Sequence, residues 1–170
     1  MNRRCMQIRL TTILYALASV LVVIGQTSGS SVDPRIGTWK LNLEKSKFAA
    51  GRASPQVQVR KLESRPDGFT VFTQSGIDAE GNPTFTQASY KFDSKEYPEY
   101  TQATLASFAT AGVKPNTNKY RLVDAYTVEI TRIDAAGKVT ATNTQTMSKD
   151  GKTHSVTSTG RPGIQVWERQ

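Results

Sequence analysis

The chain has 170 residues, with 22 basic and 14 acidic side chains, a formal net charge of +8, one histidine and a single cysteine, Cys5. One cysteine excludes a disulfide framework, and the scarcity of cysteine and histidine excludes transition-metal sites with the usual number of ligands. The basic residues are scattered rather than gathered in a stripe with interleaved aromatics, so we do not expect nucleic-acid binding.

Residues 1–30 have the layout of a secretory signal peptide. Arg3, Arg4 and Arg9 precede the uncharged run LTTILYALASVLVVI at 10–24, and the small and polar residues GQTSGSS follow. An uncleaved membrane anchor is the alternative, but a helix of this length spans only about 23 Å, short of the roughly 30 Å hydrocarbon core. We therefore expect an exported protein, periplasmic or extracellular, with no stable membrane insertion after cleavage and one folded domain at 31–170.

The rest of the chain alternates between turn signals and short runs rich in Thr, Val, Tyr and Phe. The turns carry Gly and Asp, as in RPDG at 65–68, DAEGN at 78–82 and KDG at 149–151. Short strands at this spacing predict an all-β fold, and closure of the sheet would remove its exposed edges. We expect an antiparallel up-and-down β-barrel of about 8–10 strands. The expected strands are 36–43, 56–63, 69–75, 84–92, 95–98, 118–123, 126–133, 138–148, 153–160 and 164–169.

One stretch departs from this pattern. In TQATLASFATAG, residues 101–112, Leu105 and Phe108 have helical spacing and alanines surround them. Gly112 and Pro115 then end the run. We expect a short helix or an ordered loop here.

Alternation with a period of two predicts which strand faces are buried. Tyr126, Val128 and Ile130 share one face of their strand, as do Val57 and Val59 of an earlier strand. In 138–148, Asn143 and Gln145 fall on the same face as apolar residues. Because unpaired amides are costly in a dry core, these two indicate a water-filled cavity.

The segment Gly37-Thr38-Trp39 resembles the Gly-x-Trp signature on the first strand of lipocalins, which belong to the calycin-like barrels. In that family the tryptophan closes one end of the barrel and a basic residue of the last strand packs across its ring. The resemblance implies that Arg169 is this cation–π partner and that Gly37 permits a close passage of the chain. A core tryptophan without a ligand role is the plainer interpretation of Trp39.

Four segments in the same order, GTWKLNLEKSKF, YKFDSKEYP, SKDGKT and ERQ, resemble secreted bacterial lipocalin-like domains of unestablished function. The similarity covers nearly all of the chain after residue 30. It implies a β-barrel and a bacterial exported protein, and it carries over no catalytic residues.

No motif of an enzyme stands out. His154, the only histidine, shares a face with Val156 and Ser158 and is expected to be a packed residue. Asp78 and Glu80 lack the spacing of a calcium-binding EF-hand loop and fit a hairpin turn. A phosphate loop and a nucleophile elbow are both missing. We therefore expect no enzymatic activity, no cofactor and no metal.

A barrel of about eight strands either holds one small ligand or is filled by its own side chains. We expect an exported protein that binds a small, largely apolar ligand between Tyr90, Tyr120 and Tyr126. Its cavity should measure at least about 300 Å³ and open away from Trp39. The candidate ligand-binding residues are Tyr90, Phe92, Tyr120, Tyr126, Val128 and Ile130.

Two other hypotheses stay open. A filled barrel would act as a cell-envelope or protein-interaction module, with an exposed apolar patch around Leu105 and Phe108. A weak hydrolase would use a pair of carboxylates, for which residues such as Glu96 and Glu99 are available.

Overall fold

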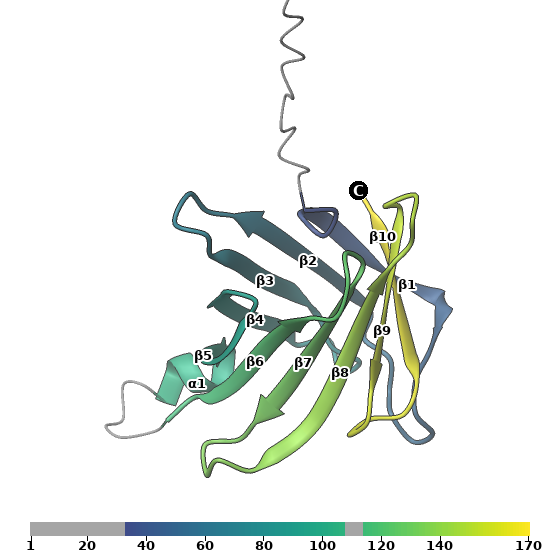
Figure 1. Ribbon diagram of the computed structural model, residues 1–170. Coiled ribbons are helices and arrows are strands. Elements are labelled where there is room, and N and C mark those ends of the chain that lie inside the picture. Colours follow the sequence, from purple (N-terminus) through teal and green to yellow (C-terminus); the bar gives the residue numbers. More distant parts are fainter. Residues whose placement is uncertain (1–32, 108–113) are drawn as a thin grey trace, which may run out of the picture. The chain divides into compact units, whose positions relative to one another are not determined.

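The computed structural model describes residues 33–107 and 114–170, so the expected signal peptide and Phe108 lie outside the described residues. The described residues form ten strands and one short helix (Figure 1). The helix is α1 Gln102–Ser107. The strands are β1 Gly37–Lys47, β2 Val57–Ser64, β3 Thr70–Ile77, β4 Pro83–Tyr90, β5 Asp93–Thr101, β6 Asn116–Leu122, β7 Thr127–Ile133, β8 Val139–Met147, β9 Thr153–Ser158 and β10 Ile164–Arg169.

The strands form a closed antiparallel barrel. Each strand pairs with the next one along the chain, and β10 pairs with β1 to complete the ring. At that junction Trp39 lies opposite Arg169 on one side and opposite Arg60 of β2 on the other. The expected all-β class and the antiparallel barrel are therefore confirmed.

One difference from the expected strands concerns β5. It runs over Asp93–Thr101 rather than 95–98, with a register shift between Asp93 and Glu96 in its pairing with β6. Its first half is charged and exposed, and Ser94 adopts a positive φ of 62°. The strand is held by backbone pairing with both neighbours rather than by an apolar face, so periodicity marks only a part of it.

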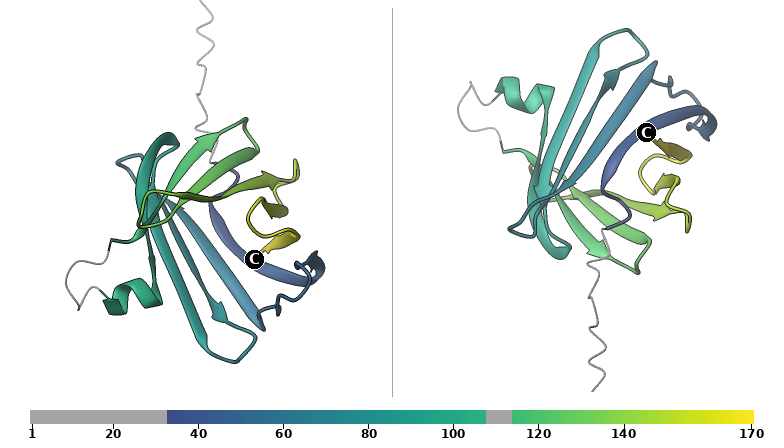
Figure 2. Two further views of the ribbon diagram at one scale, coloured as in Figure 1. Left: turned by 90° about the horizontal axis from the view of Figure 1, so that it is seen from below. Right: turned by 90° about the horizontal axis from the view of Figure 1, so that it is seen from above.

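The helix α1 follows β5 directly and lies on the outside of the ring of strands (Figure 2). Its first turn is capped by two threonines: Thr104 N donates to Thr101 Oγ1 at 3.2 Å, and Thr101 N donates to Thr104 Oγ1 at 2.6 Å. The expected helix is thus present as far as residue 107. No helix in the described part of the chain has the length and apolar character needed to cross a bilayer.

The buried side chains of the barrel form two clusters that share Phe72 as a neighbour. One cluster contains Trp39, Leu41, Leu62, Met147 and Trp167. The other contains Ala88, Tyr90, Tyr120, Val128 and Ile130. Because inward and outward residues alternate along each strand, both clusters lie on the inner face of the barrel wall.

Candidate ligand-binding cavity

One end of the barrel is closed around Trp39, which is fully buried. The Arg169 guanidinium carbon lies 4.3 Å from the centre of the indole, the contact that the lipocalin resemblance implied. The His154 ring stacks on the same indole, with ring centres 4.7 Å apart. Trp39 Nε1 donates a hydrogen bond to the carbonyl of Arg35 at 2.9 Å. Trp39 is therefore held by groups from both termini of the domain.

Arg169 also explains the glycine of the Gly-x-Trp segment. Its Nη1 donates to the carbonyl of Ile36 at 2.9 Å, and its Nε donates to the carbonyl of Gly151 at 2.7 Å. Gly37 has φ of 140°, and a Cβ at this position would lie 2.5 Å from Arg169 Nη1. The close neighbour of Gly37 is thus a side chain of the last strand rather than a passing segment of backbone.

Above this closed end the barrel contains a cavity of about 640 Å³. Its lining reaches residues at the far ends of the strands, among them Lys47, Thr101 and Asn116. Lys47 pairs with Ile164, which lies five residues along β10 from Arg169, the partner of Trp39, or about 17 Å along the strand. The cavity therefore extends away from Trp39, as expected, and its volume is above the expected minimum.

Three of the six candidate ligand-binding residues line this cavity, namely Tyr90, Tyr120 and Ile130. The rings of Tyr90 and Tyr120 stack face to face, with centres 3.5 Å apart and an angle of 3° between them. Burial raises the pKa of both hydroxyls above the ordinary value, so both stay protonated at neutral pH. The pair presents a neutral aromatic surface to the cavity.

The other three candidates are not among the residues that line the cavity. Val128 is buried within the cluster that contains Tyr90 and Tyr120 and does not line the cavity. Phe92 lies in the connection after β4, where its ring packs edge-on against Tyr90 at 5.4 Å and lies under the guanidinium of Arg35 at 4.8 Å. Tyr126 is 39% exposed, because β7 begins only at Thr127 and alternation does not extend into the preceding turn.

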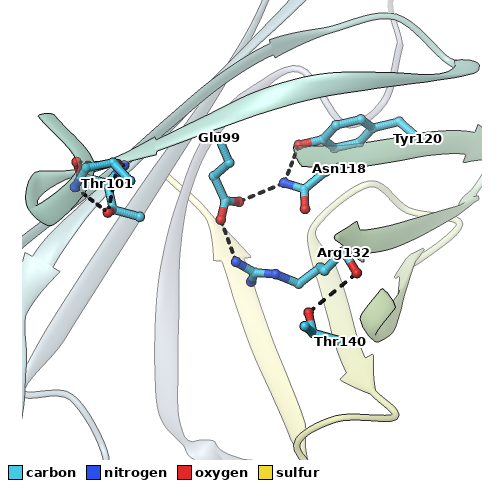
Figure 3. A network of polar contacts seen from close by, with 7 residues as sticks. Glu99, Thr101, Asn118, Tyr120, Arg132 and Thr140 are labelled. Carbon is cyan, nitrogen blue, oxygen red and sulfur yellow. Dashed lines mark hydrogen bonds and ion pairs between the residues drawn. The ribbon is translucent and has the colours of Figure 1, made fainter. Parts of the chain in front are cut away.

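One wall of the cavity carries a polar network, drawn in Figure 3. Glu99 of β5 accepts hydrogen bonds from Asn118 Nδ2 at 2.9 Å and from Arg132 Nη2. Asn118 Nδ2 also lies 3.2 Å from the hydroxyl of Tyr120. These contacts fix the orientation of the Asn118 amide, because a flipped amide would place its oxygen against the carboxylate of Glu99. Asn118 Oδ1 is buried and has no partner among the described residues.

The amides of β8 occupy the position that the alternation predicted. Asn143 and Gln145 both line the cavity, so this face of β8 turns toward the interior of the barrel. Asn143 Oδ1, like that of Asn118, is buried without a partner in the described part of the chain. Two carbonyl oxygens of the wall are therefore available to accept hydrogen bonds from a ligand or from water.

The inner end of the cavity is formed in part by Arg60, which the sequence analysis missed. Alternation places Val57 and Val59 on the buried face of β2, but Arg60 and Leu62 are the buried residues of that strand. Arg60 Nη2 donates to Gln74 Oε1 at 2.7 Å, and its guanidinium carbon lies 3.5 Å from the centre of the Trp167 ring. Its Nη1 lies 3.2 Å from His154 Nε2.

The protonation of Arg60 and His154 follows from their burial. Burial lowers the pKa of Arg60 to about 9, so the guanidinium is charged at neutral pH. Burial, and then the positive charges of Arg60 and Arg169, lower the pKa of His154 to about 2. The imidazole is therefore neutral, and its Nε2 accepts the hydrogen bond from Arg60.

The candidate carboxylate pair of a hydrolase does not meet in the cavity. Glu99 lines it, whereas Glu96 forms an exposed ion pair with Lys119, with 3.3 Å between Nζ and Oε1. Among the residues that line the cavity, Glu99 is the one carboxylate, and a two-carboxylate mechanism requires a second. Within residues 33–107 and 114–170, His, Cys, Asp and Glu side chains form no group of three that could hold a metal ion.

No protein-family model matches the chain, and no curated protein matches it either.

Proposed function

We propose that this protein is an exported, lipocalin-like barrel that binds a small molecule in its cavity. The observation that carries the proposal is the cavity of about 640 Å³, lined by buried polar groups that lack partners among the described residues. Ligand pockets typically measure about 300–1,000 Å³ and combine apolar walls with a few directed polar groups. A barrel filled by its own side chains, the alternative expected from sequence, would not leave a cavity of this volume.

The lining favours an amphipathic ligand over the largely apolar one expected from the sequence. Leu62, Phe72, Ile130 and the Tyr90–Tyr120 pair offer apolar and aromatic surface. Amides of several strands lie among these groups. An apolar ligand alone would leave the buried oxygens of Asn118 and Asn143 without a donor, which disfavours its binding.

The proposal is tested by native mass spectrometry of protein purified from its own secretion route. We expect a small molecule to remain bound at one copy per chain. Gln145→Phe would place a ring in the cavity and should abolish this complex. Thr146→Phe adds a ring on the exposed side of the same strand and should retain it. Retention of the ligand by the Gln145→Phe variant would contradict binding in the cavity.

A further inference from the structure

Arg60 has more hydrogen-bond donors than partners. A guanidinium has five N–H groups, and the contacts of Arg60 engage two of them, one with His154 and one with Gln74. Its Nε is buried and has no partner in the described part of the chain. The side chain is only 6% exposed, and it lines the cavity.

Arg60 is also a buried cation without a counter-ion. It takes part in none of the ion pairs found among the described residues, and the nearest polar groups, His154 and Gln74, are neutral. Glu99 is already paired with Arg132. A buried charge is ordinarily paired, because burial removes it from water without compensation. The site therefore has a deficit of negative charge at its inner end.

The other charged side chains of the cavity also give it an excess of positive charge. Its lining contains five basic side chains and one carboxylate. Lys47, Arg52 and Arg161 come from the end of β1 and from the loops after β1 and β9, away from Trp39. Burial and the charge of Arg161 lower the pKa of Arg52, so these two cations lie close enough to repel each other. A cavity in which basic side chains predominate attracts ligands of negative charge.

We propose that the ligand carries an anionic oxygen group, a carboxylate, sulfonate or phosphate, which binds to Arg60 at the inner end of the cavity. This inference rests on the proposed function and names the class of its ligand. A guanidinium binds such groups through paired, charge-assisted hydrogen bonds. The neutral His154 holds the guanidinium of Arg60 in place without adding a second cation. The apolar part of the ligand would then lie along Phe72 and the stacked tyrosines, nearer the opening.

The test uses two probes with the same aromatic frame. Anilinonaphthalene sulfonate carries an anionic group, and N-phenylnaphthylamine lacks it. Binding of both probes to the whole exported protein is measured by isothermal titration calorimetry. We expect Arg60→Gln to weaken binding of the sulfonate by at least about tenfold and to change binding of the neutral probe by less than about twofold. Arg60→Lys retains the charge and should recover part of the affinity.

Arg121→Gln is the matched control, since it removes the same charge from an exposed arginine that pairs with Glu129. It should leave both probes unaffected. Thermal unfolding of each variant shows whether the barrel still forms, and if Arg60→Gln fails to fold, the comparison of Arg60→Lys with the unmodified protein decides. Equal effects of the Arg60 variants on both probes, or none on either, would overturn the anion site and leave the binding function standing. Failure of the unmodified protein to bind either probe would overturn both.

Discussion

Arg60 Nη1 lies 3.2 Å from His154 Nε2, so a buried cation rests against a buried imidazole that remains neutral. The two residues are 94 positions apart in the chain and come from β2 and β9. Trp39 stacks on the imidazole, and Trp167 lies against the guanidinium. The closed end of the barrel is thus a layer of aromatic rings and cations in which a proton on His154 would be strongly unfavourable.

This contact makes the stability of the barrel sensitive to mild acid. The pKa of His154 is about 2 in the folded chain and about 6.5 in the unfolded chain, so only the unfolded chain takes up a proton between these values. The free energy of unfolding therefore has its full value above the unfolded pKa of His154 and decreases as the pH falls below that pKa. We expect the free energy of unfolding to drop by about 2 kcal/mol between about pH 7 and about pH 5. Urea unfolding at the two pH values measures this change.

His154→Gln supplies the control for that prediction. A glutamine oxygen still accepts a hydrogen bond from Arg60, but the side chain does not titrate. Carboxylates such as Asp78 and Asp150, whose pKa values are lowered by hydrogen bonds, titrate below this range. The variant should therefore have a nearly flat stability between the two pH values. An unchanged pH dependence in this variant would show that His154 is not the group responsible.

The Gly37–Arg169 pair gives a second prediction. Gly37→Ala would place a Cβ 2.5 Å from Arg169 Nη1, at a φ of 140° that side chains rarely adopt. We expect a loss of about 2–4 kcal/mol in the free energy of unfolding, measured in urea. Gly137→Ala is the control, because Gly137 has a positive φ of 86° but no atom within 4 Å of the added carbon. It should cost only about 1–2 kcal/mol.

A double-mutant cycle separates crowding from backbone strain. In an Arg169→Ala background the added carbon at position 37 no longer meets a guanidinium. Gly37→Ala should then cost about 1 kcal/mol less than it does in the unmodified protein. If the cost is the same in both backgrounds, the conformation of the backbone alone requires the glycine.

The sequence predicts the barrel well because its strands are separated by turns with a physical requirement for particular residues. Gly68, Gly81, Gly137 and Gly151 all have positive φ in the turns between strands. Asn143 and Gln145 likewise predict a cavity behind their strand, since their polarity conflicts with the apolar residues on the same face. Each of these signals is local, so it can be recognised without knowledge of the rest of the fold.

The polar part of the site could not be predicted in the same way. Arg60 is buried because Trp167, His154 and Gln74 surround it, and β3, β9 and β10 supply these partners. Asn118 depends in the same way on Glu99, a residue of the neighbouring strand. Hydrophobic alternation assigns such residues to the outer face, since it registers polarity and not the partners that compensate it.

Glu99 and Glu96 provide a third prediction. Glu99 is buried and accepts hydrogen bonds from Asn118 and Arg132. Glu99→Ala therefore removes the carboxylate partner of both side chains and leaves the amide nitrogen of Asn118 with the Tyr120 hydroxyl as its acceptor among the described residues. We expect a loss of about 2 kcal/mol in the free energy of unfolding. Glu96→Ala removes the carboxylate of an exposed ion pair on the same strand and should cost less than about 1 kcal/mol. Equal costs, measured by urea unfolding, would contradict the structural role of the network in Figure 3.

The two tryptophans of the closed end give the last prediction, because they differ in one hydrogen bond. Both are fully buried, and an arginine guanidinium lies over each ring, Arg169 over Trp39 and Arg60 over Trp167. Trp39 Nε1 donates to the carbonyl of Arg35, whereas Trp167 Nε1 is buried without a partner among the described residues. Trp→Phe removes the same atoms at both positions, but only at position 39 does it remove a hydrogen bond.

Trp39→Phe should therefore destabilise the barrel by about 1–2 kcal/mol more than Trp167→Phe does. At position 167 the substitution also removes a buried donor without a partner, and this gain offsets part of the free energy that is lost with the packing. The gap in stability between the two variants therefore becomes wider. Urea unfolding of the two variants, with tyrosine fluorescence or circular dichroism as the signal, measures it. If Trp167→Phe proves the more damaging change, the Nε1 of Trp167 has a partner that stabilises the fold, and the hydrogen bond from Trp39 to Arg35 is not what distinguishes the two rings.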